Sequence, residues 1–132
     1  MKISTRSQYG LRAMVHLAKC KNEHCSLKVI SQKENISFDY LEKILSKLEK
    51  SGLVKSKKGV QGGYIIGKNP SKIKIGEIIN ILEGEIVLVK CMNSLCPKGK
   101  KCLTRSFWRK LQDALDKALN SVTLADLIKG KK

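Results

Sequence analysis

Three of the chain's five cysteines, Cys91, Cys96 and Cys102, fall within one stretch of twelve residues. The residues between them are rich in Lys, Gly, Asn and Pro and have no apolar periodicity, which is typical of a loop. Thiolates are soft ligands, so three of them on one loop can converge on an iron–sulfur cluster or on zinc. Zinc is the weaker interpretation, because zinc-binding cysteines usually come in C-x-x-C pairs and this chain has no such pair.

A plain thiol switch is the third interpretation of the same loop. Four lysines flank its cysteines, and nearby positive charge favours the reactive thiolate; they are Lys90, Lys98, Lys100 and Lys101. The remaining cysteines, Cys20 and Cys25, are expected to be an ordinary helix-end cysteine and an ordinary loop cysteine. An odd number of cysteines in a chain predicted to be cytoplasmic favours metal or redox chemistry over a framework of disulfides.

The charge of the chain predicts an anionic partner. Its 132 residues carry 27 Lys and Arg against 11 Asp and Glu, a formal net charge of +16. Nucleic acid is the simplest such partner, because neutralising phosphates supplies most of the free energy of non-specific binding. The excess is the same in residues 1–67 and 68–132, +8 in each, so the prediction of DNA binding depends on the pattern of elements.

Hydropathy predicts a protein that does not enter a membrane. No apolar run approaches the roughly 18 residues of a membrane span, and the N-terminal residues lack the apolar segment of a signal peptide. We therefore expect a cytoplasmic protein that forms one compact unit.

The first fifty residues predict three helices, at 4–20, at 27 to about 34 and at 38 to about 50. Ser26 and Ser37 are the expected N-caps of the second and third. The lone His16 in the first helix is expected to be structural or exposed rather than a ligand. The third helix has one apolar stripe, formed by Leu41, Ile44, Leu45 and Leu48. Two short helices joined by a tight turn predict a helix-turn-helix.

A two-stranded hairpin is predicted directly after the third helix. Residues 53–58 and 64–66 are the expected strands, and the glycine-rich segment 59–63 supplies the turn. A hairpin in this position is the wing of a winged helix. Lys57 and Lys58, just before the turn, can reach phosphates or a minor groove.

The second half of the chain predicts a short helix at about 76–83, a long helix from Thr104 or Ser106 to about Asn120, and a last short helix. The last helix begins with the capping box Thr123-Leu-Ala-Asp126. Because the winged domain is already closed, we expect the long helix to pair with a second copy. Its predicted dimerisation residues are Trp108, Leu111, Leu115, Ala118, Leu119 and Val122.

The predicted fold class is mainly α with a small β-wing: a winged helix-turn-helix plus a long C-terminal dimerisation helix. We divide the chain into a DNA-binding domain at 1–84, a cysteine-rich cluster-binding loop at 85–103, and a dimerisation helix with its tail at 104–132.

The chain resembles the Rrf2 family of dimeric winged-helix regulators, which includes IscR, NsrR and CymR. The segments that carry the resemblance are 1–5, Tyr9–Met14, Ile36–Glu42, Gly52–Ser56, Gly62–Tyr64, Gly76–Ile78 and Thr123–Leu127. The resemblance implies a homodimer on a partly palindromic operator of double-stranded DNA. It puts the third helix in the major groove, with Tyr40, Glu42 and Lys43 near bases, and the wing at the minor groove. The full predicted DNA-binding set is Ser37, Asp39, Tyr40, Glu42, Lys43, Lys47, Lys57, Lys58 and Gln61.

The resemblance also implies a cofactor. Family members with three cysteines at this place hold an iron–sulfur cluster, so the predicted metal ligands are Cys91, Cys96 and Cys102. Relatives similar to IscR complete a two-iron cluster with a histidine three residues after the third cysteine. Here that residue is Arg105, which stays protonated and cannot ligate.

Relatives similar to NsrR complete a four-iron cluster with an aspartate from the first helix of the other subunit. The corresponding residue here is Gln8, a weak neutral donor. The number of irons is therefore open, and so is the fourth ligand. Its candidates are Gln8 across the dimer, His24, one of Cys20 and Cys25, and a solvent molecule or small thiol.

These inferences predict a DNA-binding transcription regulator, a repressor, whose cluster senses iron–sulfur status, redox state or nitric oxide. The alternative resembles the CymR branch: a cluster-free regulator of cysteine or sulfur metabolism, gated by thiol oxidation or by a partner protein such as a cysteine-biosynthesis enzyme. An enzyme is not expected. The chain has no His/Asp/Glu constellation, and Gly62-Gly63 leads into a strand rather than opening a helix, unlike a nucleotide-binding loop.

Overall fold

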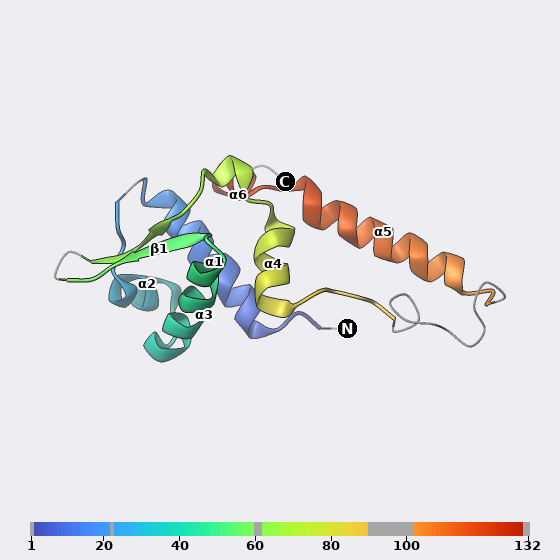
Figure 1. Cartoon of the computed structure of the whole chain (residues 1–132), viewed down its shortest axis with the longest axis horizontal. Helices are drawn as coiled ribbons and strands as arrows, with labels where there is room; N and C mark the ends of the chain where they lie inside the picture. Colours follow the sequence, from blue (N-terminus) through green and yellow to red (C-terminus); the bar gives the residue numbers. More distant parts are fainter. Residues whose placement is uncertain (1, 22, 60–61, 90–101, 131–132) are drawn as a thin grey trace.

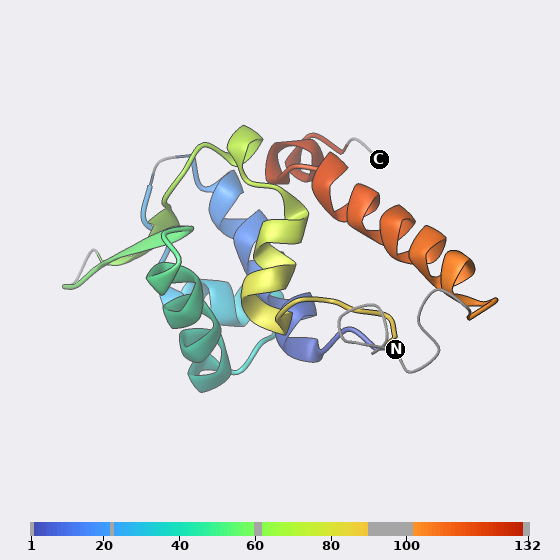
Figure 2. The same cartoon turned by 45° about the vertical axis from the view of Figure 1, so that its right-hand side comes forward.

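A computed structural model of the protein describes residues 2–21, 23–59, 62–89 and 102–130. In chain order its elements are α1 (Thr5–Lys19), α2 (Leu27–Glu34), α3 (Phe38–Lys50), β1 (Val54–Lys57), β2 (Gly63–Ile66), the 3-10 helix η1 (Pro70–Lys72), α4 (Ile75–Glu83), α5 (Arg105–Ser121) and α6 (Leu124–Ile128). Figures 1 and 2 show one body made of α1 to α4, the hairpin and α6, from which α5 extends. The predicted fold class, mainly helical with a small β-wing, is confirmed.

Serine N-caps begin the first three helices. The hydroxyls of Ser4, Ser26 and Ser37 each accept a hydrogen bond from the backbone N–H three residues later, which satisfies a donor that the helix itself leaves unpaired. Asn35 ends α2 in the left-handed conformation, with φ of 55°, and so turns the chain toward α3. The predicted bounds of the helix-turn-helix are confirmed.

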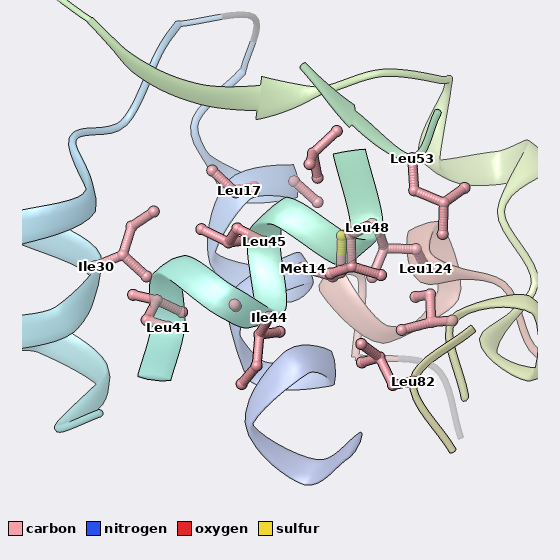
Figure 3. Packing of buried hydrophobic residues seen from close by; sticks show 14 of the residues in the cluster. Met14, Leu17, Ile30, Leu41, Ile44, Leu45, Leu48, Leu53, Leu82 and Leu124 are labelled. Carbon is pink, nitrogen blue, oxygen red and sulfur yellow. The ribbon is translucent and has the colours of Figure 1, made fainter. Parts of the chain in front are cut away.

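The core forms where α3 packs its apolar stripe onto α1 and α4. The largest fully buried side chains around it include Met14 and Leu17 of α1 and Leu82 of α4, and Figure 3 shows them facing the stripe. Each of these large apolar side chains contributes about 1.5–3 kcal/mol when fully buried. Because the stripe fixes how α3 is rotated, the opposite face of α3 must point outward.

The C-terminal end of the chain returns to this core. Leu124 of α6 is fully buried with the side chains of α1 and α4. A backbone bridge between Lys74 and Thr123 holds α6 beside the segment that precedes α4. The predicted capping box is confirmed: Thr123 and Asp126 exchange their side-chain-to-backbone hydrogen bonds.

The wing is a two-stranded antiparallel sheet. Val54 pairs with Ile66 at its base and Lys57 with Gly63 near the turn. Within the described residues, no helix has the length and apolar character needed to cross a membrane.

Candidate DNA-binding face and cysteine sites

The outer face of α3 displays most of the residues predicted to contact DNA. Opposite the buried stripe, five of them are exposed: Ser37, Asp39, Glu42, Lys43 and Lys47. A helix that is held in the core by one face and presents polar side chains on the other is suited to enter a major groove.

Tyr40 of α3 packs against α1. Its ring meets the Tyr9 ring edge to face, with 5.9 Å between ring centroids, and its hydroxyl lies 3.4 Å from Oγ1 of Thr5. The Arg12 guanidinium lies 5.5 Å from the centre of the Tyr9 ring. Tyr40 therefore joins α3 to α1, and its contact with a base stays a prediction.

A groove of about 720 Å³ separates α3 from the wing. It is lined by Glu42, Lys43, Ser46, Lys47, Lys50 and Tyr64. Three lysines against one glutamate make the groove positive, which suits a phosphate backbone. Lys50 and Tyr64 are absent from the predicted set. Lys50 continues the helical spacing of Lys43 and Lys47, so the sequence could have predicted its place on this face. Tyr64 lies on β2 and reaches the groove only through the tertiary fold, so no local pattern indicates it.

The hydroxyl of Tyr64 is a hydrogen-bond donor at this groove. Burial raises the pKa of Tyr64, and the nearby carboxylates of Glu49 and Glu42 raise it further. Tyr64 therefore stays protonated at neutral pH, and a phosphate oxygen, which only accepts, is a suitable partner for it.

Glu49 fixes the wing to α3. Its Oε2 accepts a hydrogen bond from the backbone N–H of Ser56 at 3.1 Å and another from the Ser56 hydroxyl.

The far end of the hairpin presents Lys57 and Lys58, both exposed. Gln61, the last predicted DNA contact, lies outside the described residues.

The cysteine loop is described only at its edges. Cys91, Cys96 and the four flanking lysines lie outside the described residues. Cys102 is partly buried, its Sγ lies 3.3 Å from Oγ1 of Thr104, and its carbonyl accepts a hydrogen bond from the N–H of Arg105 at 3.3 Å. The third cysteine therefore lies against the first turn of α5.

The candidate fourth ligands have different surroundings. Gln8 is exposed on α1, and its Nε2 donates to the carbonyl of Ile3 at 3.0 Å. His24 is exposed in the connection between α1 and α2. Within the described part of the chain, His24 does not belong to a group of His, Cys, Asp or Glu side chains that could hold a metal ion.

Cys20 ends α1 and Cys25 lies in the connection to α2, as expected. The two are also joined in a disulfide, which the sequence did not predict. Two backbone features bring them together. Lys21 takes the left-handed conformation, with φ of 46°, and reverses the chain after α1. Two backbone hydrogen bonds then hold Cys25 against Tyr64. The Cα atoms of the two cysteines lie 6.7 Å apart, within the range that a disulfide spans.

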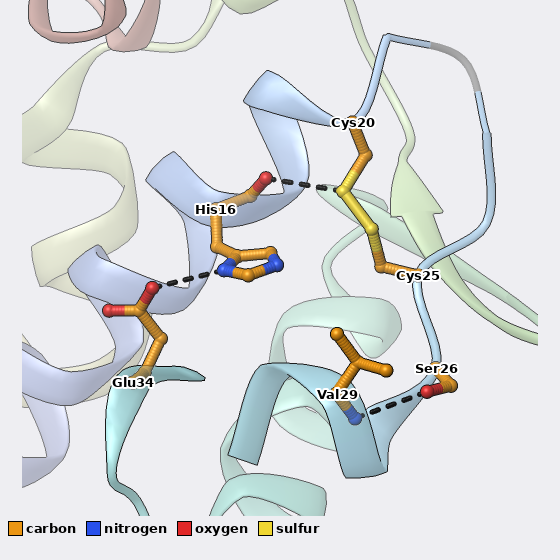
Figure 4. The surroundings of a disulfide bond; sticks show 6 residues. All are labelled: His16, Cys20, Cys25, Ser26, Val29 and Glu34. Carbon is orange, nitrogen blue, oxygen red and sulfur yellow. Dashed lines mark hydrogen bonds and ion pairs between the residues drawn. A yellow bond between two sulfur atoms is a disulfide. The ribbon is translucent and has the colours of Figure 1, made fainter. Parts of the chain in front are cut away.

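His16 lies beside this pair, where Figure 4 shows its ring between Glu34 and the two sulfurs. Its Nδ1 lies 3.0 Å from Oε2 of Glu34. The ligand atoms of His16, Cys20 and Cys25 all lie within 4.8 Å of one another. The sequence signal for this group is the spacing of four residues between His16 and Cys20, which puts both on one face of α1.

The predicted dimerisation stripe is only partly covered in the single chain: Leu111 and Ala118 are exposed, and the other four residues are half-buried. Gln112 ties α5 to the preceding segment, since its side chain accepts from the N–H of Leu88 at 3.0 Å and donates to the carbonyl of Ile86 at 2.9 Å. Yet no residue of α5, from Arg105 to Ser121, is fully buried. Leu111 is 41% exposed, and Phe107 beside Trp108 is 57% exposed.

Comparison with known proteins gives a consistent result. A family model described as Rrf2, iron-dependent transcriptional regulator, matches residues 3–130. The HTH-type transcriptional regulator CymR of Bacillus subtilis is 44% identical over 128 residues, which cover 96% of this chain and 89% of CymR. IscR of Escherichia coli is 37% identical over 130 residues, which cover 97% of this chain and 80% of IscR. The solved structure of CymR, the global cysteine regulator of Bacillus subtilis, has a TM-score of 0.85 at 41% identity over 100% of this chain and 99% of that one.

Proposed function

We propose that this chain, which belongs to the Rrf2 family of transcription regulators, is a cytoplasmic repressor whose binding to its operator is controlled by an iron–sulfur cluster on Cys91, Cys96 and Cys102. Its relatives are transcription regulators, so the chain is a DNA-binding regulator and not an enzyme.

The observation that carries the cluster proposal is the set of donor atoms. Three thiols within twelve residues fit the soft sulfur ligation of iron–sulfur clusters, and the family is described as iron-dependent. When bound, a cluster supplies a group whose charge and ligation respond to redox state and to small reactive molecules. Cys102 lies three residues before α5 begins at Arg105, so a group held by these thiols would lie next to the start of that helix.

Residues of α5 would link the cluster to the affinity for DNA. We propose that the stripe from Trp108 to Val122 packs against the same stripe of a second copy, which makes a homodimer. The two copies of α3 then have to meet major grooves about one helical turn apart, roughly 34 Å. Because that spacing is fixed by the DNA, a small rotation of α5 relative to the body changes affinity strongly.

Anaerobic purification tests the cluster. We expect a coloured protein that contains iron and acid-labile sulfide, and a Mössbauer spectrum that distinguishes two-iron from four-iron clusters. A colourless protein without iron or sulfide, even after reconstitution, overturns the proposal. The variant with Cys91→Ser, Cys96→Ser and Cys102→Ser is the matched control, and it should stay colourless.

A second candidate is favoured by the similarity to CymR of Bacillus subtilis, described as the global cysteine regulator. Under this alternative the chain binds no cluster, responds to thiol oxidation or to a partner protein, and controls cysteine or sulfur metabolism. Full and normally regulated repression in cells by the triple serine variant would favour it over the cluster.

A further inference from the structure

We propose a second metal site, separate from the cysteine loop, in which His16, Cys20 and Cys25 bind Zn²⁺ when the Cys20–Cys25 disulfide is reduced. The three ligand atoms already lie within 4.8 Å of one another. Tetrahedral zinc with Zn–S bonds of about 2.3 Å places two thiolate sulfurs about 3.8 Å apart and an imidazole nitrogen at a similar distance. The group therefore needs only small side-chain movements, chiefly separation of the two sulfurs, to enclose an ion.

His16 is oriented as metal-binding histidines are. Its side chain is 13% exposed, and Nδ1 lies 3.0 Å from Oε2 of Glu34. A carboxylate at this nitrogen holds the proton on Nδ1 and leaves the lone pair on Nε2, the arrangement that raises the basicity of a zinc-bound imidazole. Figure 4 shows the second ring nitrogen on the side away from Glu34, toward the two sulfurs.

The two cysteines are positioned by backbone, so their sulfurs stay near each other without the disulfide. Cys20 is the C-cap of α1, and its N–H donates to the carbonyl of Leu17. Cys25 is held by its two hydrogen bonds to Tyr64. With both Cα positions set by hydrogen bonds, reduction leaves the thiols facing His16, which is the preorganisation that a metal site needs.

The donor set selects the ion. Two thiolates and one neutral imidazole neutralise the charge of Zn²⁺, and the set Cys₂His with a water in the fourth position is an established zinc geometry. Magnesium and calcium require oxygen ligands, which this group does not offer, because the Glu34 carboxylate is engaged with Nδ1 of His16.

Zinc and the disulfide exclude each other. A dithiol reductant gives two electrons and two protons to the Cys20 and Cys25 sulfurs, the S–S bond breaks, and the reductant becomes a disulfide. Zinc then displaces the two thiol protons into solvent. Because Cys25 adjoins the Ser26 N-cap of α2 and pairs with β2, the bound ion would join α1 to the start of the helix-turn-helix and to the wing.

Zinc binding is tested in the full chain carrying Cys91→Ser, Cys96→Ser and Cys102→Ser, so that the loop contributes no thiols. The protein is reduced with a phosphine, loaded with Zn²⁺ and freed of loose metal by gel filtration. We expect one zinc per chain, roughly tenfold or more weaker binding after His16→Gln or Cys25→Ser, and no change after Glu23→Gln, an exposed residue of the connection that holds Cys25. Equal zinc retention by His16→Gln, or none by the starting protein, overturns the site.

Binding of Co²⁺ gives a second test that needs no substitution at His16 or Cys25 and therefore does not depend on those variants folding. The reduced triple serine protein should show a thiolate-to-cobalt charge-transfer band and the visible bands of tetrahedral Co²⁺, and absence of the charge-transfer band overturns the proposal. Since the background lacks Cys91, Cys96 and Cys102, either outcome leaves the cluster proposal, tested by iron and sulfide content, unaffected.

Discussion

Cys25 and Tyr64 exchange two backbone hydrogen bonds, each with an N···O distance of 2.9 Å. The pair joins the residue before the N-cap of α2 to the second strand of the wing. Since α3 and Tyr64 line the same groove, these two bonds set where the wing lies relative to the helix proposed to enter DNA. The helix-turn-helix and the wing are thus joined by direct hydrogen bonds.

Gly63 is required for this junction. Its φ is +145°, which L side chains rarely adopt, and a Cβ there would overlap the carbonyl of Cys25. We expect Gly63→Ala to lower the free energy of unfolding by about 1–3 kcal/mol, measured by urea denaturation. Gly59→Ala is the matched control, because Gly59 also has positive φ, 113°, but a Cβ there meets no atom within 4 Å. Equal losses in the two variants would show that the close approach to Cys25 contributes nothing.

Glu83 predicts a dependence of stability on pH. Its carboxylate accepts hydrogen bonds from the Ser4 hydroxyl at 2.6 Å, the Ser7 hydroxyl at 2.7 Å and the Ser4 N–H at 3.1 Å. These bonds, first from Ser4 and then from Ser7, lower the pKa of Glu83. A depressed pKa in the folded state stabilises the fold above the unfolded value, about 4.3, and this contribution is lost as the pH falls through the folded value.

The measurement is thermal unfolding of the wild type and Glu83→Gln from about pH 7 to about pH 3. We expect the wild type to have the higher Tm at neutral pH and its advantage to shrink toward the acid end. An advantage that is constant across this range would contradict the ionic role of Glu83, since Gln retains an accepting oxygen but does not titrate.

Local sequence patterns predicted the helices and strands, whereas contacts between residues far apart in the chain determine the functional sites. The spacing of Leu41, Ile44, Leu45 and Leu48 predicted which face of α3 is buried, because residues three and four apart lie on the same face of a helix. The same spacing does not tell which surface covers that face, so the return of Leu124 to the core and the place of Tyr64 beside α3 could not be predicted. The Cys20–Cys25 pair was missed for a related reason: it depends on the reversal at Lys21 and on the bonds from Cys25 to Tyr64.

Lys58 tests the contact between wing and DNA. Replacing it by Ala should weaken binding to duplex DNA and reduce the slope of log K against log salt by about 0.9 for each phosphate that the wing no longer neutralises. Fluorescence anisotropy across a salt series measures both quantities. Lys110→Ala is the control, because Lys110 is also exposed but lies on α5, away from α3 and the hairpin. An unchanged slope for Lys58→Ala would count against a phosphate contact at the wing.

Leu111 tests the proposed dimer. It lies on the predicted stripe of α5 and is 41% exposed in the single chain, so in a dimer its burial would contribute about 1–2 kcal/mol per subunit. A carboxylate in its place would have to be desolvated without a partner, which costs more than the leucine contributes. We expect Leu111→Asp to sediment as a monomer and to bind DNA weakly, while Asp113→Asn, at an exposed neighbouring position, stays dimeric. A dimeric Leu111→Asp, or a monomeric wild type, would mean that α5 does not form the interface.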